Sequence, residues 1–290
     1  MRGMYMKTCD LFSKKTVFSF EVFPPKKEIP VETVYPTLEK LSGLHPDFIS
    51  VTCGAGGKGG NLTVEVASKI KSLGCETAAH LPCINLDKEE VLDTLQKLRE
   101  HGIENILALR GDKTPGIEPK CVFPHANDLI AFIRQQTGDE FNVIGACYPE
   151  GHPNSKTLAE DVEHLKIKVD AGASELITQL FFDNHDFYNF LDKTAQAGIR
   201  VPIEAGIMPV TNKKQIERMV TLCGATLPLK FQKILTRYGH DNIALRDAGI
   251  AYAIDQIVDL LANGVDGVHI YTMNSPYVAT RIADAVRTLL

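Results

Sequence analysis

The feature of this sequence that most constrains its fold is a regular alternation of short apolar segments with longer amphipathic ones. Segments rich in β-branched and apolar residues predict strands at 16–23, 47–52, 76–81, 105–110, 142–148, 175–181, 202–207 and 267–271. Segments with helical spacing follow them at 31–41, 62–73, 88–100, 126–136, 157–169, 185–195, 213–222 and 275–289. Because every strand is followed by a helix, parallel strands are expected, and the count predicts a (β/α)8 TIM barrel of the α/β class.

The segment between the seventh and eighth predicted strands is longer than one crossover needs. Residues 229–238 and 243–262 indicate one or two extra helices there, which we expect to serve packing or contact between subunits. No linker, low-complexity stretch or charge block interrupts the alternation. The prediction is therefore one (β/α)8 catalytic domain, residues 1–290, with extra helix before the eighth strand.

Composition excludes several classes of protein. With 44% hydrophobic and 23% charged residues the chain resembles a globular protein, and its net charge of −5 offers no basic stripe for nucleic acid. No apolar run is long enough for a membrane span or a secretory signal. The seven cysteines are scattered without a C-x-x-C pair, which favours reduced thiols and a cytoplasmic location and argues against a structural zinc site or a disulfide framework. No other metal site is expected.

In a barrel of this kind the chemistry lies at the carboxyl ends of the strands. The polar residues expected at that end are Glu21, Thr52, His80, Arg110 with Asp112, Tyr148, Gln179, Glu204 and Tyr271. Glu21 stands out because it interrupts the apolar segment F-S-F-E-V-F-P-P at 18–25, so its carboxyl must be paired, neutral or used. Its apolar neighbours would keep it protonated, as a proton donor requires.

One motif suggests a different fold. Residues 54–59 read G-x-G-x-x-G between a predicted strand and a helix, with Glu76 about the right distance downstream for a Rossmann nucleotide site. However, a complete strand–helix unit precedes this motif and the alternation continues to the C-terminus, which favours the barrel. Helix N-termini with Arg110 and Lys168 could hold a phosphate group. The residues alone thus indicate an acid, a second carboxylate, and a pocket for a flat, phosphorylated ligand.

Taken together, the motifs at the strand ends resemble the catalytic barrel of the methylenetetrahydrofolate reductase family in its bacterial form. They are F-S-F-E-V-F-P-P (18–25), V-T-C-G-A-G (51–56), A-H-L-P-C (79–83), L-R-G-D (109–112), Y-P-E-G-H-P (148–153), K-V-D-A-G-A (168–173), I-T-Q-L-F-F-D (177–183), G-I-M-P-V-T-N (206–212) and Y-T-M-N (271–274). The resemblance implies a homo-oligomeric barrel that binds FAD. It also implies oxidation of NADH or NADPH, then reduction of 5,10-methylenetetrahydrofolate to 5-methyltetrahydrofolate, in a ping-pong cycle through one shared pocket.

The resemblance also implies roles for individual residues. Glu21 is similar to the general acid that opens the imidazolidine ring of the folate, and Asp112 to a carboxylate beside flavin and folate. The expected substrate-binding residues are Thr52, Asp112, Gln179 and Gln215. The expected FAD-binding residues are His80, Arg110, Gly111, Asp112, Ala126, Tyr148, His152, Asp161, His164 and Lys168.

The chain departs from the family pattern at four positions. Ser275 stands where related bacterial enzymes often have an arginine that contacts folate, and Met219 where some members have an aromatic residue beside the nicotinamide. Ile167 and His164 replace polar residues typical of FAD contacts. Two alternatives stay open: a barrel that takes electrons from a partner protein, and a flavin-free pterin-binding methyltransferase.

Overall fold

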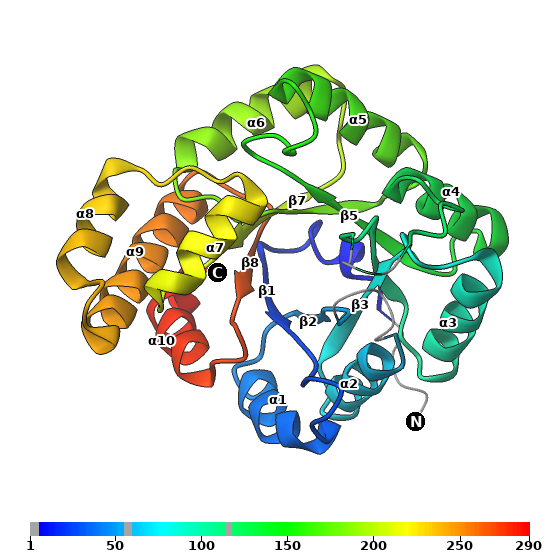
Figure 1. The fold of residues 1–290 in the computed structure, drawn as a ribbon, viewed down its shortest axis with the longest axis horizontal. Helices are drawn as coiled ribbons and strands as arrows, with labels where there is room; N and C mark the ends of the chain where they lie inside the picture. The colour runs from blue at the N-terminus through cyan, green and yellow to red at the C-terminus, as the bar shows by residue number, and fades with distance from the viewer. Residues whose placement is uncertain (1–5, 55–59, 114–115, 117) are drawn as a thin grey trace.

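The computed structural model describes residues 6–54, 60–113, 116 and 118–290, and its central feature is a closed barrel of parallel strands (Figure 1). The strands follow one another around the barrel in chain order, and β1 pairs with both β2 and β8 to close it. They are β1 (Val17–Val22), β2 (Phe48–Val51), β3 (Glu76–Pro82), β4 (Asn105–Leu109), β5 (Asn142–Cys147), β6 (Glu175–Thr178), β7 (Ile203–Ile207) and β8 (Gly267–Tyr271). The predicted TIM barrel is confirmed. The glycine-rich motif at 54–59 lies, apart from Gly54, outside the described residues.

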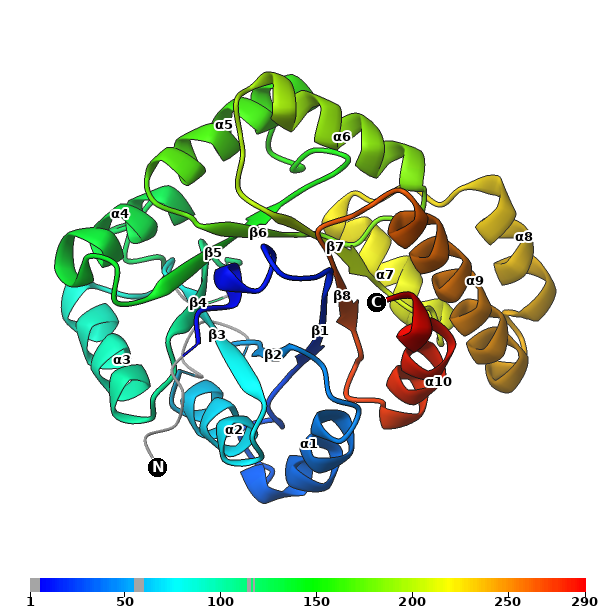
Figure 2. The same cartoon turned by 180° about the vertical axis from the view of Figure 1, so that it is seen from behind.

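Helices surround this barrel on all sides (Figures 1 and 2). They are α1 (Tyr35–Ser42), α2 (Gly60–Ser72), α3 (Lys88–Glu100), α4 (Ala126–Thr137), α5 (Leu158–Asp170), α6 (Asn184–Gln196), α7 (Lys213–Cys223), α8 (Leu229–Tyr238), α9 (Asn242–Ala262) and α10 (Pro276–Val286). Short 3-10 turns lie at Thr8–Asp10, Val31–Val34 and Arg287–Leu289. Among the helices of the described ranges, none is long and apolar enough to cross a membrane.

The helix that completes the ring between β7 and β8 is α9, not the expected segment 213–222. Helix α9 packs against both α6 and α10, the neighbours that a ring position requires. Its Gly249 lies so close to the chain after β7 that a Cβ there would stand 1.8 Å from the carbonyl oxygen of Val210. The two extra helices are therefore α7 and α8. The sequence pattern predicted all three helices but assigned the ring position to the wrong one.

Helices α7 and α8 share a second apolar cluster with the ends of β6, β7 and β8. Its buried members include Leu180, Phe182, Met208, Ile216 and Phe231. Strand β6 was predicted to run to residue 181 but ends at Thr178, because the chain leaves the sheet there to place Leu180 and Phe182 in this cluster. The additional helices thus cover one side of the barrel's open end.

Strand β1 shows how the pleat positions polar groups inside the barrel. Phe18, Phe20 and Val22 point outward into the main core beneath the helices. The alternate residues point inward: Val17 joins a small apolar cluster in the barrel, and Ser19 and Glu21 follow it towards the carboxyl end. The two-residue period therefore places the Glu21 carboxyl at the inner rim of the barrel.

The amino-terminal segment closes the opposite end of the barrel, as the blue turn near the barrel axis in Figure 2 illustrates. Thr8 donates from its backbone nitrogen to Asn105 Oδ1 at 2.8 Å and from its hydroxyl to Glu175 Oε2 at 2.8 Å. Asn142 Nδ2 donates to the same Glu175 oxygen at 3.0 Å. Access to the barrel interior is therefore from the carboxyl end of the strands.

Candidate functional site

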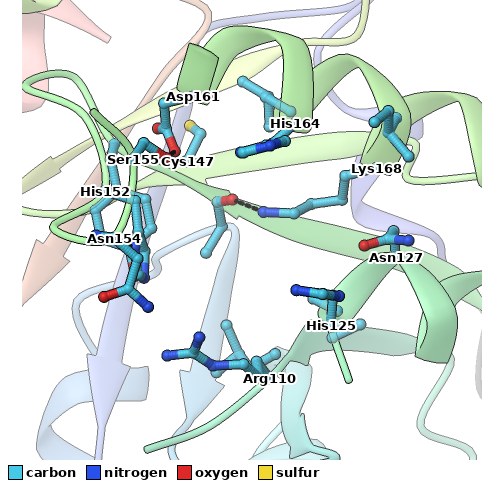
Figure 3. A pocket seen from close by; sticks show the side chains of 17 residues that line it. Arg110, His125, Asn127, Cys147, His152, Asn154, Ser155, Asp161, His164 and Lys168 are labelled. Atoms are coloured by element: carbon cyan, nitrogen blue, oxygen red, sulfur yellow. Dashed lines mark hydrogen bonds between the residues drawn. The ribbon is translucent and has the colours of Figure 1, made fainter. Parts of the chain in front are cut away.

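A cavity of about 450 Å³ lies between the carboxyl ends of β4 and β5 and the helices α4 and α5 (Figure 3). Small residues of the strands, Ala108 and Ala146, form part of its floor and leave room for a ligand. Among the predicted FAD-binding residues, those that line it are Arg110, Ala126, Tyr148, His152, Asp161, His164 and Lys168. Residues that were predicted to bind FAD, and that come from four separate segments of the chain, thus lie around one cavity.

The cavity is suited to an anionic ligand. Arg110 and Lys168 approach it from facing sides in Figure 3, and α4 begins at Ala126 with its amino terminus at the cavity. Unpaired backbone N–H groups and the helix dipole favour negative charge at such a terminus. Lys168 Nζ donates to the carbonyl oxygen of Ala146, and burial lowers the pKa of its ammonium group. The lysine is therefore held in place by the wall of the barrel.

The loop after β5 supplies the aromatic and imidazole groups of the cavity. The rings of Tyr148 and His152 meet edge to face with centroids 4.7 Å apart. Burial, and next the nearby Arg110 charge, lower the pKa of His152, and burial raises the pKa of Tyr148 to about 12. Asp161 is buried at the start of α5 and accepts a hydrogen bond from Ser155 Oγ at 2.8 Å. At neutral pH the loop thus presents a neutral imidazole and a neutral phenol.

Sequence reasoning missed four polar residues of the same cavity: His125, Asn127, Asn154 and Ser155. The first two flank the start of α4, where His125 is the N-cap residue and has Asp128 as its capping partner. A polar residue directly before a predicted helix was the signal that could have found His125. The other two lie in the irregular loop after β5, which has no periodic signal.

Glu21 lies outside this cavity, at the inner rim of the barrel. Its surroundings are polar, contrary to the expected apolar enclosure, because the flanking phenylalanines point outward. Glu21 Oε2 lies 3.5 Å from His80 Nε2 and 3.8 Å from His269 Nε2, and its side chain is 19% exposed. Burial lowers the pKa of His80 to about 4, so that imidazole is neutral. His80 thus contacts Glu21, and it is not among the residues that line the cavity.

Of two further residues expected at the rim, Tyr271 lies there and Glu204 does not. Glu204 is the second residue of β7 and lies fully buried inside the barrel, so its expected position at the strand end is wrong. Tyr271, the last residue of β8, is at the rim as expected and donates from its hydroxyl to the carbonyl oxygen of Thr178 at 2.6 Å. Its ring also meets His269 edge to face at 5.4 Å.

Three of the remaining predicted residues lie just beyond strand ends, and the fourth lies in a helix. Thr52 comes directly after β2, and its backbone nitrogen donates to Val22 O at 2.9 Å. Gln179 comes directly after β6, where its Oε1 accepts from the backbone nitrogen of Leu180. Asp112 is exposed just beyond β4. Gln215 is half-buried in the first turn of α7.

Gly111 is held in a conformation that only glycine accommodates easily. Its φ is +85°, and a Cβ there would stand 2.8 Å from Pro82 Cβ and 3.3 Å from Ile84 Cγ2. The loop after β4 therefore packs directly on the end of β3. This packing positions the neighbouring Arg110 and Asp112 on either side of the glycine.

The departures from the family pattern also have structural settings. Ser275 is the N-cap of α10, with its hydroxyl accepting from Val278 N at 3.5 Å. Met219 packs, half-buried, against the second apolar cluster. His164 and Ile167 are exposed residues of α5 at the edge of the cavity. Each substitution thus lies in α5, α7 or the start of α10.

Comparisons with known proteins point to one family. The family model described as methylenetetrahydrofolate reductase matches residues 6–287. The 5,10-methylenetetrahydrofolate reductase of Pectobacterium carotovorum is 36% identical over 258 residues, which cover 88% of this chain and 85% of that protein. That of Escherichia coli is 35% identical, covering 88% and 86%. An Arabidopsis thaliana protein named methylenetetrahydrofolate reductase (NADH) 1 is 38% identical over 90% of this chain, and the chain spans about half the length of such plant relatives.

Among solved structures, a Clostridium thermocellum protein described as binding two copies of 5-methyl-5,6,7,8-tetrahydrofolic acid superposes with a TM-score of 0.65. It is 15% identical and the match covers 97% of this chain and 98% of that one, which shows a shared fold. A tryptophan synthase chain of Mycobacterium tuberculosis matches with a TM-score of 0.54 at 11% identity. The family model over residues 6–287 and the bacterial relatives lead to one conclusion: this chain belongs to the methylenetetrahydrofolate reductase family.

Proposed function

We propose that this protein reduces 5,10-methylenetetrahydrofolate to 5-methyltetrahydrofolate, using FAD and NADH or NADPH. The observation that carries the proposal is the Glu21 carboxyl at the inner rim of a barrel of this family, open to a ligand on one side and facing imidazoles on the other. The bacterial relatives that the chain covers over most of their length carry the name of this activity. The chain would act as a single catalytic domain, assembled into a homo-oligomer.

The residues around the cavity fit the phosphates of FAD. Arg110, Lys168 and the start of α4 would hold negative charge, while His152 and Tyr148 offer flat surfaces and hydrogen bonds. His80, Gly111 and Asp112, which do not line the cavity, would contact the part of the cofactor nearest the barrel mouth. The bound flavin would carry hydride from the nicotinamide to the folate.

The proton chemistry of the proposed reaction would belong to Glu21. Protonation of a folate nitrogen opens the five-membered ring and leaves a cation that accepts hydride. A carboxyl at hydrogen-bonding distance from that nitrogen can supply the proton, and such acid catalysis contributes about 10²–10⁴-fold. Asp112 would stabilise the positive charge that develops. Thr52, Gln179 and Gln215 would hold the folate.

An anaerobic titration followed by visible spectroscopy tests the proposal. FAD-loaded protein should lose its flavin absorbance on addition of NADH or NADPH and regain it on addition of 5,10-methylenetetrahydrofolate. Recovery without formation of 5-methyltetrahydrofolate would refute the assigned reaction. Protein that never takes up FAD would favour the pterin-binding methyltransferase instead. Flavin that is reduced by dithionite but by neither nicotinamide would favour an electron-transfer partner protein.

A paired variant tests the cofactor site. Lys168→Met removes the ammonium group and keeps a side chain of similar length, so FAD should be lost during gel filtration. His45→Gln provides a control at a site outside the cavity lining and should retain FAD. Equal FAD retention in both variants would contradict the role given to Lys168.

A further inference from the structure

The loop between β8 and α10, residues 272–275, binds the end of β1 through two polar side chains. Thr272 is 1% exposed, and its hydroxyl donates to the carbonyl oxygen of Glu21 at 2.6 Å. Asn274 Nδ2 donates to the carbonyl oxygen of Phe23 at 2.8 Å, and its Oδ1 accepts from the backbone nitrogen of Phe23 at 3.0 Å. The loop after β8 thus holds the backbone on both sides of Val22.

The side-chain amide of Asn274 takes the place of strand pairing beyond the end of the sheet. Strands β1 and β8 pair in register as far as Glu21 and Tyr271, where β8 ends. An amide group that accepts from the N–H of a residue and donates to its C=O supplies both bonds that a neighbouring strand would give. From the β2 side, Thr52 N donates to Val22 O at 2.9 Å. The end of β1 is therefore held from both neighbouring strands.

The loop makes these bonds from an uncommon backbone conformation. Met273 and Asn274 have φ values of 50° and 54°, in the left-handed region that few residues with a Cβ adopt, although asparagine is enriched there. Met273 packs against the second apolar cluster, and Ser275 caps α10 with its own hydroxyl. The start of the helix therefore does not require the Asn274 amide. Backbone strain of this kind gathers at functional sites, where the surrounding structure holds it.

The contacts of the Glu21 side chain do not by themselves fix its direction. Its Oε2 lies 3.5 Å from His80 Nε2 and 3.8 Å from His269 Nε2, both longer than the ordinary hydrogen-bond distance of about 2.7–3.2 Å. The side chain is also 19% exposed, so it is open to solvent on one side. The direction of the carboxyl therefore depends on the backbone of Glu21, whose carbonyl oxygen is held by Thr272.

We propose, on the basis of the proposed function of Glu21 as the acid, that Thr272 and Asn274 are positioning residues for its carboxyl. They hold the backbone of residues 21–23, and so they set the distance between the Glu21 carboxyl and the folate nitrogen that it protonates. A general acid must lie within hydrogen-bonding reach of that atom, and displacement by about 1 Å can cost about 10²-fold in rate.

A matched pair of variants at Thr272 tests this role. Thr272→Val removes the hydroxyl and keeps a branched side chain, whereas Thr272→Ser keeps the hydroxyl that donates to Glu21. Asn274→Gly removes the amide and also relieves the left-handed backbone, so strain cannot explain its effect. Thr272→Val and Asn274→Gly should lower the limiting rate of the folate half-reaction by about 10- to 100-fold, and Thr272→Ser should restore most of that rate.

Stopped-flow reoxidation of the reduced flavin, measured over a range of 5,10-methylenetetrahydrofolate concentrations, separates this role from a merely structural one. A misplaced acid lowers the limiting rate but leaves the dissociation constant of folate and the rate of flavin reduction by the nicotinamide unchanged. A structural role predicts lower stability in urea, with both half-reactions of the folded protein unchanged or lowered together. That second pattern would overturn the proposal.

A double variant asks whether Thr272 acts through the acid. When Glu21→Gln is already present, no acid is left to position, so the addition of Thr272→Val should not slow the folate half-reaction further. If the two substitutions instead multiply their effects, the hydroxyl of Thr272 acts independently of Glu21, and the proposal is wrong.

Amide hydrogen exchange tests the contact between the two loops without any folate chemistry. The amide hydrogen of Phe23 should be protected in the unaltered protein and in Thr272→Ser, and should exchange faster in Asn274→Gly. Equal exchange in the unaltered protein and Asn274→Gly would overturn the proposal. Failure of the unaltered protein to reduce folate would instead overturn the proposed function, and the exchange rates would still report whether Asn274 holds the end of β1.

Discussion

Replacement of Gly111 by alanine should both destabilise the protein and weaken the FAD binding proposed above. The residue has a φ of +85°, and left-handed backbone costs an L-residue with a Cβ about 1–2 kcal/mol. The new Cβ would also stand 2.8 Å from Pro82 Cβ, well inside the 3.5–4.0 Å of ordinary carbon contact. Overpacking of this kind costs about 1–3 kcal/mol. The expected loss is therefore about 2–5 kcal/mol of unfolding free energy.

Gly74→Ala isolates the steric part of this loss. Gly74 has a similar φ of +83°, but a Cβ there would meet no other atom within 4 Å beyond its chain neighbours, so this variant carries the backbone cost alone. The difference between the two variants should be about 1–3 kcal/mol, which is the contribution of contact with Pro82. Urea unfolding followed by circular dichroism measures both variants under the same conditions.

A functional readout accompanies the stability measurement. Relief of the contact with Pro82 must displace the loop that carries Arg110 and Asp112, so Gly111→Ala should lose FAD during gel filtration while Gly74→Ala retains it. Equal unfolding free energies for the two variants would refute the steric argument. Full FAD retention by a destabilised Gly111→Ala would refute the link between this turn and the cofactor.

Three further predictions concern single carboxyl groups. Glu21→Gln should keep flavin reduction by the nicotinamide but slow the folate half-reaction by about 10²–10⁴-fold; if both half-reactions survive, Glu21 is not the acid. Asp112→Asn should slow the folate half-reaction because the developing positive charge loses its carboxylate, and it should shift the flavin reduction potential because this carboxylate is expected beside the flavin. An unchanged potential in spectroelectrochemistry would contradict that position. Burial raises the pKa of Glu175 to about 7 from 4.5, so the folded protein holds this proton where the unfolded chain has released it. Unfolding free energy should accordingly fall as pH rises from about 4.5 to 7, by roughly 3 kcal/mol from this group, and urea unfolding of Glu175→Gln should lack that fall.

The barrel and one of its key residues could be predicted from the sequence because both depend on local patterns. Strands and helices alternate with clear stops, and parallel strands joined by helices leave few possible topologies. The two-residue period of β1 then fixes which side chains face inward, so a carboxyl near the end of the first strand must lie at the inner rim. The resemblance further predicted a set of FAD-binding residues, seven of which line one cavity.

Other features depend on contacts between distant segments. In the sequence, the segments that form α7, α8 and α9 are similar amphipathic stretches. Only packing against α6 and α10 decides that α9 completes the ring of helices around the barrel. Glu204 looked like a rim residue because the pattern does not say how far inside the barrel a strand residue lies. Ser19 and His269 are 250 residues apart and meet only because β1 pairs with β8 when the barrel closes. The sequence by itself determined the barrel and the inward-facing carboxyl of Glu21. Closure of the barrel decided which groups surround that carboxyl, since proximity between the first and last strands exists only in three dimensions.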